Sequence, residues 1–300
     1  MSHHTFSIIV PSYNEGDDIR LSIESAINQD YPAKEILVVD DSSDETPRIV
    51  REYARQGVTL IEGERKGCCG ARNLGMRSAS GDVVVLLNGD VRLPRDFLTR
   101  IVRHYEAGAD YVLVESRVFN IESLWARFVE MQHQYESKKI GDKAEWTEGF
   151  SSRREIALAV GLIPGDFKQR FCRDWFLGKA LHEAGYKKVI DLSIVVTHKA
   201  PDNLKEFWRV RKARGRFSSL TQALLLKKAK MFLVLKFLVK DLIAFFEFVF
   251  IIPFVVRVGL ISTYSWVPIR DFFPFLYVYF IQELARRVGE WEGLTKIPNS

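Results

Sequence analysis

Short apolar runs alternate with amphipathic stretches along the first ninety residues. Four such runs are rich in branched and aliphatic side chains: Phe6–Val10, Glu35–Val39, Val58–Ile61 and Val83–Leu87. Each is too short for a free-standing helix, so we interpret them as buried strands. Between the first two, Ile19, Ile23, Ala26 and Ile27 recur at helical spacing. The alternation of strands with helix-length connections predicts a doubly wound α/β sheet.

Polar clusters follow the ends of these runs. Asp40-Asp41-Ser42 follows the second run and Asn88-Gly89-Asp90 follows the fourth. Open α/β sheets bind ligands at the carboxyl edge, where a carboxylate such as Asp90 suits a divalent cation bridging a diphosphate. A turn that uses Asn and Gly for backbone reasons would give the same residues. With this topology, four side chains can converge on one crevice: Tyr13, Asp41, Arg72 and Asp90.

Several ordered motifs resemble one known family. They are Val10-Pro11-Ser12-Tyr13-Asn14-Glu15, Val38-Val39-Asp40-Asp41-Ser42-Ser43-Asp44, Ala71-Arg72-Asn73-Leu74-Gly75, Asn88-Gly89-Asp90, and Arg173-Asp174-Trp175 ahead of Leu181 and Gly185-Tyr186-Lys187. Together they resemble the inverting family 2 glycosyltransferases over roughly the first two-thirds of the chain. The resemblance implies a GT-A fold, with a doubly wound mixed sheet.

The resemblance also implies the roles of the site residues. A nucleotide site would contain Pro11, Tyr13, Glu15 and Asp41. Arg72 would contact phosphate or base, although an exposed helix Arg is the alternative. The family's metal motif usually reads Asp-x-Asp, whereas this chain has Asn88 first. Asn88 could contact a ribose or coordinate through its carbonyl, but it brings no charge. Asp90 would then be the main anionic ligand of Mg²⁺ or Mn²⁺.

Two further residues carry expectations with alternatives. Asp174 resembles the family's catalytic base, which takes the proton from an acceptor hydroxyl. Its neighbours Arg173 and Lys179 would weaken it as a base, and an Asp that opens a helix often serves as a cap. An acceptor phosphate would need only orientation. His198 follows the apolar strand Ile190–Thr197, where several family members carry a metal-binding His. A structural histidine is the alternative.

The last third of the chain changes in character. From Leu204 to Lys240 the sequence holds eleven Lys or Arg residues and one acid, Glu206. Interleaved with aromatic and aliphatic residues, this pattern is typical of basic amphipathic helices on an anionic bilayer. Leu242–Ile261 has only Glu247 and Arg257 charged, and its length matches a bilayer core of roughly 30 Å.

That segment and the apolar stretch Val258–Ile281 predict a transmembrane hairpin with both ends cytoplasmic. The adjacent pair Arg270-Asp271 and Glu247 leave two alternatives open, namely two interfacial helices or a soluble helical appendage. The membrane prediction argues against a nucleic-acid partner for the basic region. Three parts follow: a catalytic domain over residues 1–201, interfacial helices over 202–240, and a membrane hairpin with a tail over 241–300.

The residues argue against a nicotinamide enzyme and favour a cytoplasmic location. Pro11-Ser12-Tyr13-Asn14-Glu15 stands where a nicotinamide enzyme would have Gly-x-Gly-x-x-Gly. The chain enters a strand directly, so we expect no signal peptide. Cys68, Cys69 and Cys172 show no disulfide or zinc pattern, which favours a reducing cytoplasmic side.

We therefore expect a metal-dependent hexosyltransferase that uses GDP-mannose or a UDP-sugar. Its acceptor would be a polyprenyl phosphate or a glycolipid at the cytoplasmic face of the cell membrane. The hexose would be mannose or glucose. A membrane-anchored binding protein without turnover is the alternative. The sequence leaves the oligomeric state open, a homo-oligomer included.

Overall fold

The computed structural model describes residues 4–140, 148–166, 171–172, 175–250, 255–256, 258–259 and 269–297. The chain forms two compact units. The first, here called the sheet unit, comprises Met1–Arg117 and Asp142–His198. The second, the helical unit, comprises Val118–Gly141 and Lys199–Ser300. Residues 118–141 fall within the catalytic domain expected over 1–201, yet they cluster with the C-terminal helices.

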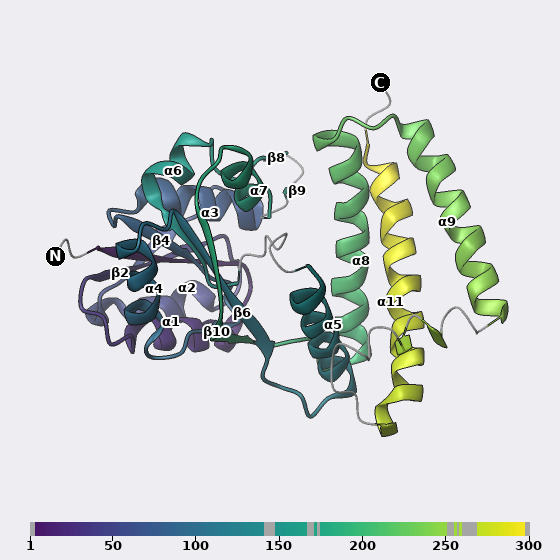
Figure 1. The fold of residues 1–300 in the computed structure, drawn as a ribbon, viewed down its shortest axis with the longest axis horizontal. Coiled ribbons are helices and arrows are strands. Elements are labelled where there is room, and N and C mark those ends of the chain that lie inside the picture. The colour runs from purple at the N-terminus through teal and green to yellow at the C-terminus, as the bar shows by residue number, and fades with distance from the viewer. Residues whose placement is uncertain are drawn as a thin grey trace. The chain divides into compact units, whose positions relative to one another are not determined.

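The sheet unit is built on a mixed sheet (Figure 1). Its described strands are β1 (Phe6–Ser12), β2 (Lys34–Asp40), β3 (Val58–Glu62), β4 (Val83–Leu86), β5 (Val91–Arg92), β6 (Tyr111–Val118), β7 (Phe150–Arg153) and β10 (Lys188–His198). They lie in the order β3-β2-β1-β4-β7-β6-β10-β5. β3, β2, β1 and β4 are parallel, whereas β7 joins β4 and β6 antiparallel and β5 joins β10 antiparallel. The predicted mixed sheet is therefore confirmed.

Helices cover both faces of this sheet. They are α1 (Ile19–Ile27), α2 (Thr46–Arg51), α3 (Gly67–Ser78), α4 (Phe97–Glu106), α6 (Arg154–Ala159) and α7 (Phe176–Glu183), with short 3₁₀ turns at Gly16–Asp18 and Ala54–Gln56. A two-stranded ladder joins β8 (Gly165–Asp166) to β9 (Phe171–Cys172). Neighbouring strand residues enter opposite cores: Val85 packs with residues of α1, α2 and α4, and Val84 with residues of α3, α6 and α7. This explains why the strands read as continuous apolar runs.

The helical unit contains four long helices and a short π-helical turn among its described residues. They are α5 (Leu124–Ile140), α8 (Leu204–Leu220), η5 (Thr221–Leu225), α9 (Lys230–Phe250) and α11 (Ile269–Thr295). α8 and α11 pack backbone against backbone. A Cβ added to Gly289 would lie 1.9 Å from the Lys212 carbonyl oxygen, and one added to Gly215 would lie 2.1 Å from that of Arg286. Only glycine allows these close contacts.

Two sequence-based expectations differ from the described structure. In the part of the chain that the structure describes, no helix is long and apolar enough to cross a membrane. The expected first span, Leu242–Ile261, is divided between the end of α9 and residues outside the described ranges. Cys69, on α3, is disulfide-bonded, so the expectation that the cysteines carry no disulfide is wrong.

The interpretation of Arg270-Asp271 as a charged interruption also changes. Asp271 is buried, and its carboxylate accepts hydrogen bonds from Nε and Nη2 of Arg127 at 2.7 and 3.0 Å. Arg127 lies on α5, whereas Arg270 approaches Asp271 only to 4.0 Å. The charge is thus paired across two helices, a partnership that sequence adjacency did not indicate.

Candidate nucleotide and metal site

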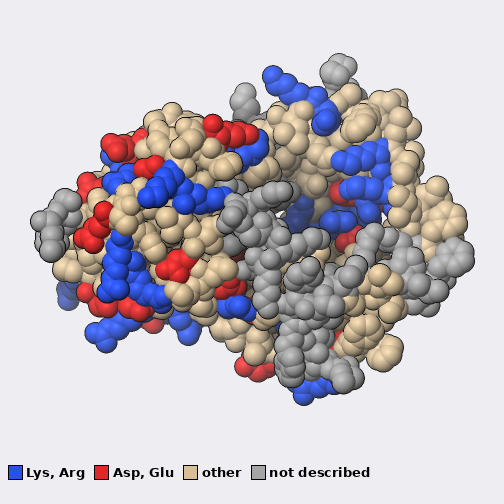
Figure 2. Space-filling model, viewed as in Figure 1, with Lys and Arg blue, Asp and Glu red and all other residues tan. Residues whose placement is uncertain are grey.

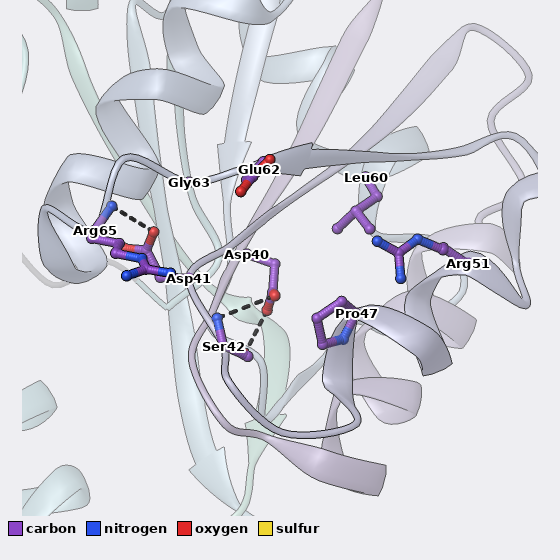
Figure 3. A pocket seen from close by; sticks show the side chains of 9 residues that line it. All are labelled: Asp40, Asp41, Ser42, Pro47, Arg51, Leu60, Glu62, Gly63 and Arg65. Carbon is purple, nitrogen blue, oxygen red and sulfur yellow. Dashed lines mark hydrogen bonds between the residues drawn. The ribbon is translucent and has the colours of Figure 1, made fainter.

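A pocket of about 190 Å³ lies at the carboxyl ends of β2 and β3 (Figure 3). Its lining combines carboxylates and guanidinium groups with two apolar side chains: Asp40, Asp41, Ser42, Pro47, Arg51, Leu60, Glu62, Gly63 and Arg65. Hydrogen-bonding groups around an apolar surface suit a flat polar ring such as a nucleobase. The pocket stands at the sheet edge where the strand pattern predicted a ligand.

Asp41 is fixed at the wall of this pocket. Its Oδ1 accepts a hydrogen bond from the backbone N–H of Arg65 at 2.7 Å, and its own N–H donates to the Ser12 carbonyl at 3.1 Å. A Cβ on Gly63 would lie 2.2 Å from Oδ1, so glycine makes room for the carboxylate. Figure 3 shows Asp41 beside Arg65, with Asp40 turned toward Ser42.

Asp40 is buried and has a supporting role that the sequence did not reveal. The hydroxyl groups of Ser12 and Ser42 both donate to its Oδ1, the second at 2.6 Å. The backbone N–H of Ser42 also donates to Oδ2 at 3.2 Å. Asp40 therefore joins the end of β1 to the loop after β2, and both Asp40 and Asp41 line the pocket.

The loop after β1 is tied to the loop after β2. Asn14 adopts a left-handed conformation, with φ of 54°. Its N–H donates to Ser42 Oγ at 2.7 Å, and its side-chain oxygen accepts from the Ser43 N–H at 2.9 Å. Tyr13 is 55% exposed on this loop, whereas Pro11 is buried within β1 opposite Val39. Of these two predicted nucleotide residues, Tyr13 presents its side chain at the surface.

Arg72 and Asn88 are joined directly. Arg72 lies on α3 with only 2% of its surface exposed, so the alternative of an exposed helix Arg is wrong. Its Nη2 donates a hydrogen bond to Asn88 Oδ1. Because Asn88 is uncharged, this contact brings no negative charge to the guanidinium. Arg72 thus carries a positive charge to the turn that follows β4.

That turn is held from two sides. The Val91 N–H donates to the Asn88 carbonyl at 3.2 Å, and Ser22 Oγ lies 2.8 and 2.7 Å from the carbonyl oxygens of Asn88 and Val91. A Cβ on Gly89 would lie 2.7 Å from Glu15 Cγ, so the Glu15 side chain packs against the turn. Glu15 therefore lies beside Asn88-Gly89-Asp90 as well as on the first loop.

Asp90 and His198 belong to one cluster. His198 is the last residue of β10 and pairs with Val91, the residue after Asp90. Burial raises the pKa of Asp90 to about 6, the positive charge of His198 opposes that rise, and the negative charges of Glu148 and Asp18 add to it. The structure thus brings the two predicted metal residues together. It adds Glu148, which lies just before β7 and was not among the predicted site residues.

This cluster fits a divalent cation that also binds substrate. Carboxylate and imidazole groups are ligands of Mn²⁺, and carboxylates with substrate phosphates are the usual ligands of Mg²⁺. Within the described ranges, no group of three or more His, Cys, Asp or Glu side chains is arranged to hold a metal ion. Diphosphate oxygens and water would have to complete the coordination around Asp90 and His198.

One predicted site residue cannot be placed. Asp174 lies outside the described residues. The helix it was expected to open begins at Phe176, and Trp175 occupies the N-cap position without a side-chain capping bond. Nearby, the Asn73 side chain makes two hydrogen bonds to the backbone of Ile163, at 2.8 and 3.0 Å. Asn73 thereby fixes the segment after α6 against α3.

The family model described as glycosyl transferase family 2 matches residues 7–157, which include β1, the Asp41 loop, Arg72 and the Asp90 turn. The chain belongs to this family. An Escherichia coli relative, the UDP-Glc:alpha-D-GlcNAc-diphosphoundecaprenol beta-1,3-glucosyltransferase WfgD, is 33% identical over 44% of this chain and 53% of its own length. The glycosyltransferase AglE of Haloferax volcanii is 28% identical over 69% of this chain and 72% of its own. The chain thus spans about half the length of WfgD.

Solved structures support the fold. The mannosyltransferase PcManGT from Pyrobaculum calidifontis, in complex with GDP-Man and Mn²⁺, matches 98% of this chain and 74% of its own. Its TM-score is 0.57 at 20% identity. S. aureus TarS 1-349 in complex with UDP-GlcNAc matches 96% of this chain and 91% of its own, with a TM-score of 0.53 at 15% identity. At these identities the likeness concerns the fold alone.

Proposed function

We propose that this family 2 enzyme transfers a hexose, with inversion, from a nucleotide diphosphate sugar to a lipid-linked acceptor. The observation that carries the proposal is the turn Asn88-Gly89-Asp90, where the Arg72 guanidinium and the Asp90–His198 cluster meet at one edge of the sheet. A cationic group and a candidate cation site beside a base-sized pocket match the parts of a nucleotide diphosphate. The same edge carries the Asp41 pocket.

Each site residue would have a role that suits its chemistry. Asp41 would accept hydrogen bonds from the base edge, and Tyr13, exposed on the loop after β1, would contact the same nucleotide. Arg72 would orient a phosphate through its planar donor fork. Asp90 and His198 would hold Mg²⁺ or Mn²⁺, which neutralises charge on the leaving diphosphate when bound. Asp174 stays the proposed base for an acceptor hydroxyl.

Two relatives bear on the donor and acceptor. The names of WfgD and WfaP, both of Escherichia coli, state UDP-Glc as donor and a GlcNAc-diphosphoundecaprenol acceptor. They support glucose as the hexose and a polyprenyl-linked acceptor for this chain. The GDP-Man complex of PcManGT keeps mannose as the second candidate. A polyprenyl acceptor requires access to a membrane, for which we propose the cytoplasmic face.

The membrane face needs its own test. A disulfide at Cys69 is unusual in a reducing compartment, so it gives no support to the cytoplasmic side. Protease protection in right-side-out and inverted membrane vesicles would locate the sheet unit. Cleavage only in inverted vesicles is the expected result, and cleavage only in right-side-out vesicles would reverse the orientation.

The proposed reaction is tested with labelled nucleotide sugars and a membrane lipid extract. Label from UDP-glucose or GDP-mannose should enter the organic phase only with divalent metal and full-length enzyme. Asp90→Ala should abolish this transfer, because it removes the main anionic ligand, whereas Asn88→Asp should keep or raise metal affinity. Undiminished transfer by Asp90→Ala in chelated buffer would remove the metal from the mechanism.

The alternative function, nucleotide-sugar binding without turnover, has a distinct outcome in the same assay. Calorimetry would show donor binding that depends on Asp41 and Arg72, while no donor is hydrolysed or transferred with any acceptor in the extract.

A further inference from the structure

Three charged side chains in the middle of helix α9, Lys236, Lys240 and Asp241, turn toward the protein. Lys240 Nζ donates to Oε1 of Glu290 at 3.0 Å, and Glu290 is only 1% exposed on α11. Asp241 Oδ2 accepts a hydrogen bond from the Trp291 indole N–H at 2.6 Å. Lys236 donates to Gln222 in the turn before α9. We call one set of α9 residues its inner face: Leu233, Lys236, Phe237, Lys240 and Asp241. Leu233 and Phe237 are buried.

The opposite face of α9 is apolar and exposed. Nine of its described side chains are between 50% and 70% exposed: Met231, Phe232, Leu235, Leu238, Val239, Leu242, Ile243, Phe245 and Phe246. Their spacing of three and four residues places them along one side of the helix. We call this set the outer face of α9. In Figure 2 the margin where Figure 1 places α9 is mostly tan, and blue atoms lie inward of it.

This arrangement is the reverse of a helix on a water-soluble protein. In water, the large apolar side chains would turn inward and the lysines outward, because exposed apolar patches of this size are rare on monomers. An apolar environment favours the observed order, since charges then need protein partners and apolar side chains do not. The described part of α9 is not apolar enough to span a bilayer, because Lys236, Lys240 and Asp241 lie in its middle.

We propose that the outer face of α9 is an in-plane docking surface for an anionic phospholipid bilayer. Charge complementarity selects this occupant. Lys227 and Lys228 are exposed just before the helix, and Lys228 Nζ lies 5.7 Å from the centre of the Phe232 ring. Lysines beside an apolar face are typical of helices that lie in the headgroup region. The inference rests on the proposed function for its biological reason, since a polyprenyl-linked acceptor resides in such a bilayer.

Flotation with vesicles tests the surface without donor or acceptor. Full-length protein should float with phosphatidylglycerol-containing vesicles and bind pure phosphatidylcholine vesicles more weakly. Leu235→Glu/Leu242→Glu should lower binding to the anionic vesicles by about tenfold or more, because two charges would enter the apolar layer. Leu192→Glu is the matched control: Leu192 is 45% exposed on β10 of the sheet unit, and its variant should float like the parent.

A milder variant covers the case in which the double glutamate protein misfolds. Lys227→Gln/Lys228→Gln should lower binding to anionic vesicles by about thirtyfold and leave binding to phosphatidylcholine unchanged. Circular dichroism and nucleotide calorimetry on every variant separate a lost surface from a lost fold. Normal nucleotide binding with lost flotation supports the docking surface, whatever the reaction proves to be.

Depth measurements distinguish an in-plane helix from a span. Met231→Cys, Leu238→Cys and Phe245→Cys, each in a Cys68→Ser background, would carry an environment-sensitive dye quenched by brominated lipids. An in-plane helix predicts similar depths for all three dyes, although the first and last lie about 20 Å apart along the helix axis. A steady increase in depth would overturn the in-plane arrangement. Absence of flotation, or dimers that lose their contact with Leu235→Glu/Leu242→Glu, would overturn the bilayer and favour a second copy as the occupant.

Discussion

Ionisation of Asp90 lowers the stability of the folded protein. Burial raises its pKa from 3.8 to about 6. A raised pKa means that the stability gained from the protonated group is complete below about pH 4 and is lost as pH rises through about 6. Asp90→Asn should therefore unfold like the parent near pH 4. At pH 7.5 without metal it should be more stable by about 3 kcal/mol, since each unit of the pKa rise is worth about 1.4 kcal/mol.

Urea titrations from pH 4 to 8 in chelator check this, with Asp191→Asn as a control of opposite sign. Partial burial raises the pKa of Asp191, but hydrogen bonds from Ser193 and His104 lower it by more. The net effect is a pKa below the usual value. Its stabilising effect is present above its unfolded pKa and lost as pH falls through the folded value. Asp191→Asn should therefore lose stability at neutral pH. A gain by Asp90→Asn that grows toward low pH would contradict the argument.

Asp41 and Arg72 make the second prediction at this scale. Replacing either with Ala should weaken nucleotide diphosphate binding by more than about tenfold, because each loses a charge-assisted contact. Asp82→Ala is the control, since Asp82 accepts hydrogen bonds from Thr5 at the amino edge of the sheet. Calorimetry measures all three. Unchanged affinity in the Asp41 and Arg72 variants would displace the nucleotide from this crevice.

Site residues next to a strand end could be predicted from sequence. Site residues contributed by other elements could not. Asp41, Asp90 and His198 each stand at or beside the end of an apolar run, so their position at one sheet edge follows from topology. Ser22 and Glu148 reach the same turn from α1 and from the segment before β7. No local pattern marks them, because their roles depend on contacts far apart in sequence.

At the scale of elements, the α8–α11 pair depends on glycine. Gly289→Ala would improve helix propensity by about 1 kcal/mol, but its Cβ would lie 1.9 Å from the Lys212 carbonyl. The steric effect should win, because backbone cannot yield as a side chain can. We expect a net destabilisation of about 1–3 kcal/mol, typical of overpacking.

Thermal unfolding measures this change, and Gly259→Ala provides the control. A Cβ on Gly259 meets nothing within 4 Å, so the same substitution there should leave the melting temperature unchanged or raised. An equal effect at both positions would show that helix propensity, and not the close approach of α8 and α11, decides the outcome.

Strands of the sheet follow their predicted bounds closely, whereas α9 (Lys230–Phe250) crosses the boundary expected between the interfacial helices, 202–240, and the membrane hairpin, 241–300. Val83–Leu86 and Phe6–Ser12 are buried on both faces, so hydrophobicity alone located them. For α9, the informative feature is the direction in which each side chain points. Hydropathy counts Lys236 and Lys240 as interruptions, but only the structure shows that both turn inward while their apolar neighbours stay exposed.

At the scale of the whole molecule, the helical unit is assembled from two separate segments. Phe128 and Val129 on α5 are buried with Phe207 of α8 and Phe275 of α11. The Phe128 and Phe207 ring centres lie 6.1 Å apart, and those of Phe128 and Phe275 lie 5.5 Å apart. A domain boundary placed near residue 201 therefore divides this core, although the linear sequence offers no sign of it.

A chain that ends after Pro201 should therefore aggregate, because α5 would lose the partners of its apolar face. Replacing residues 118–141 of that shortened chain with a short Gly/Ser linker should restore solubility, since a flexible closure costs little. The linked form should bind nucleotide with the affinity of the full chain but transfer no sugar to lipid. Light scattering and calorimetry would measure these properties. A soluble, monodisperse chain ending at Pro201 would show that α5 belongs with the sheet unit.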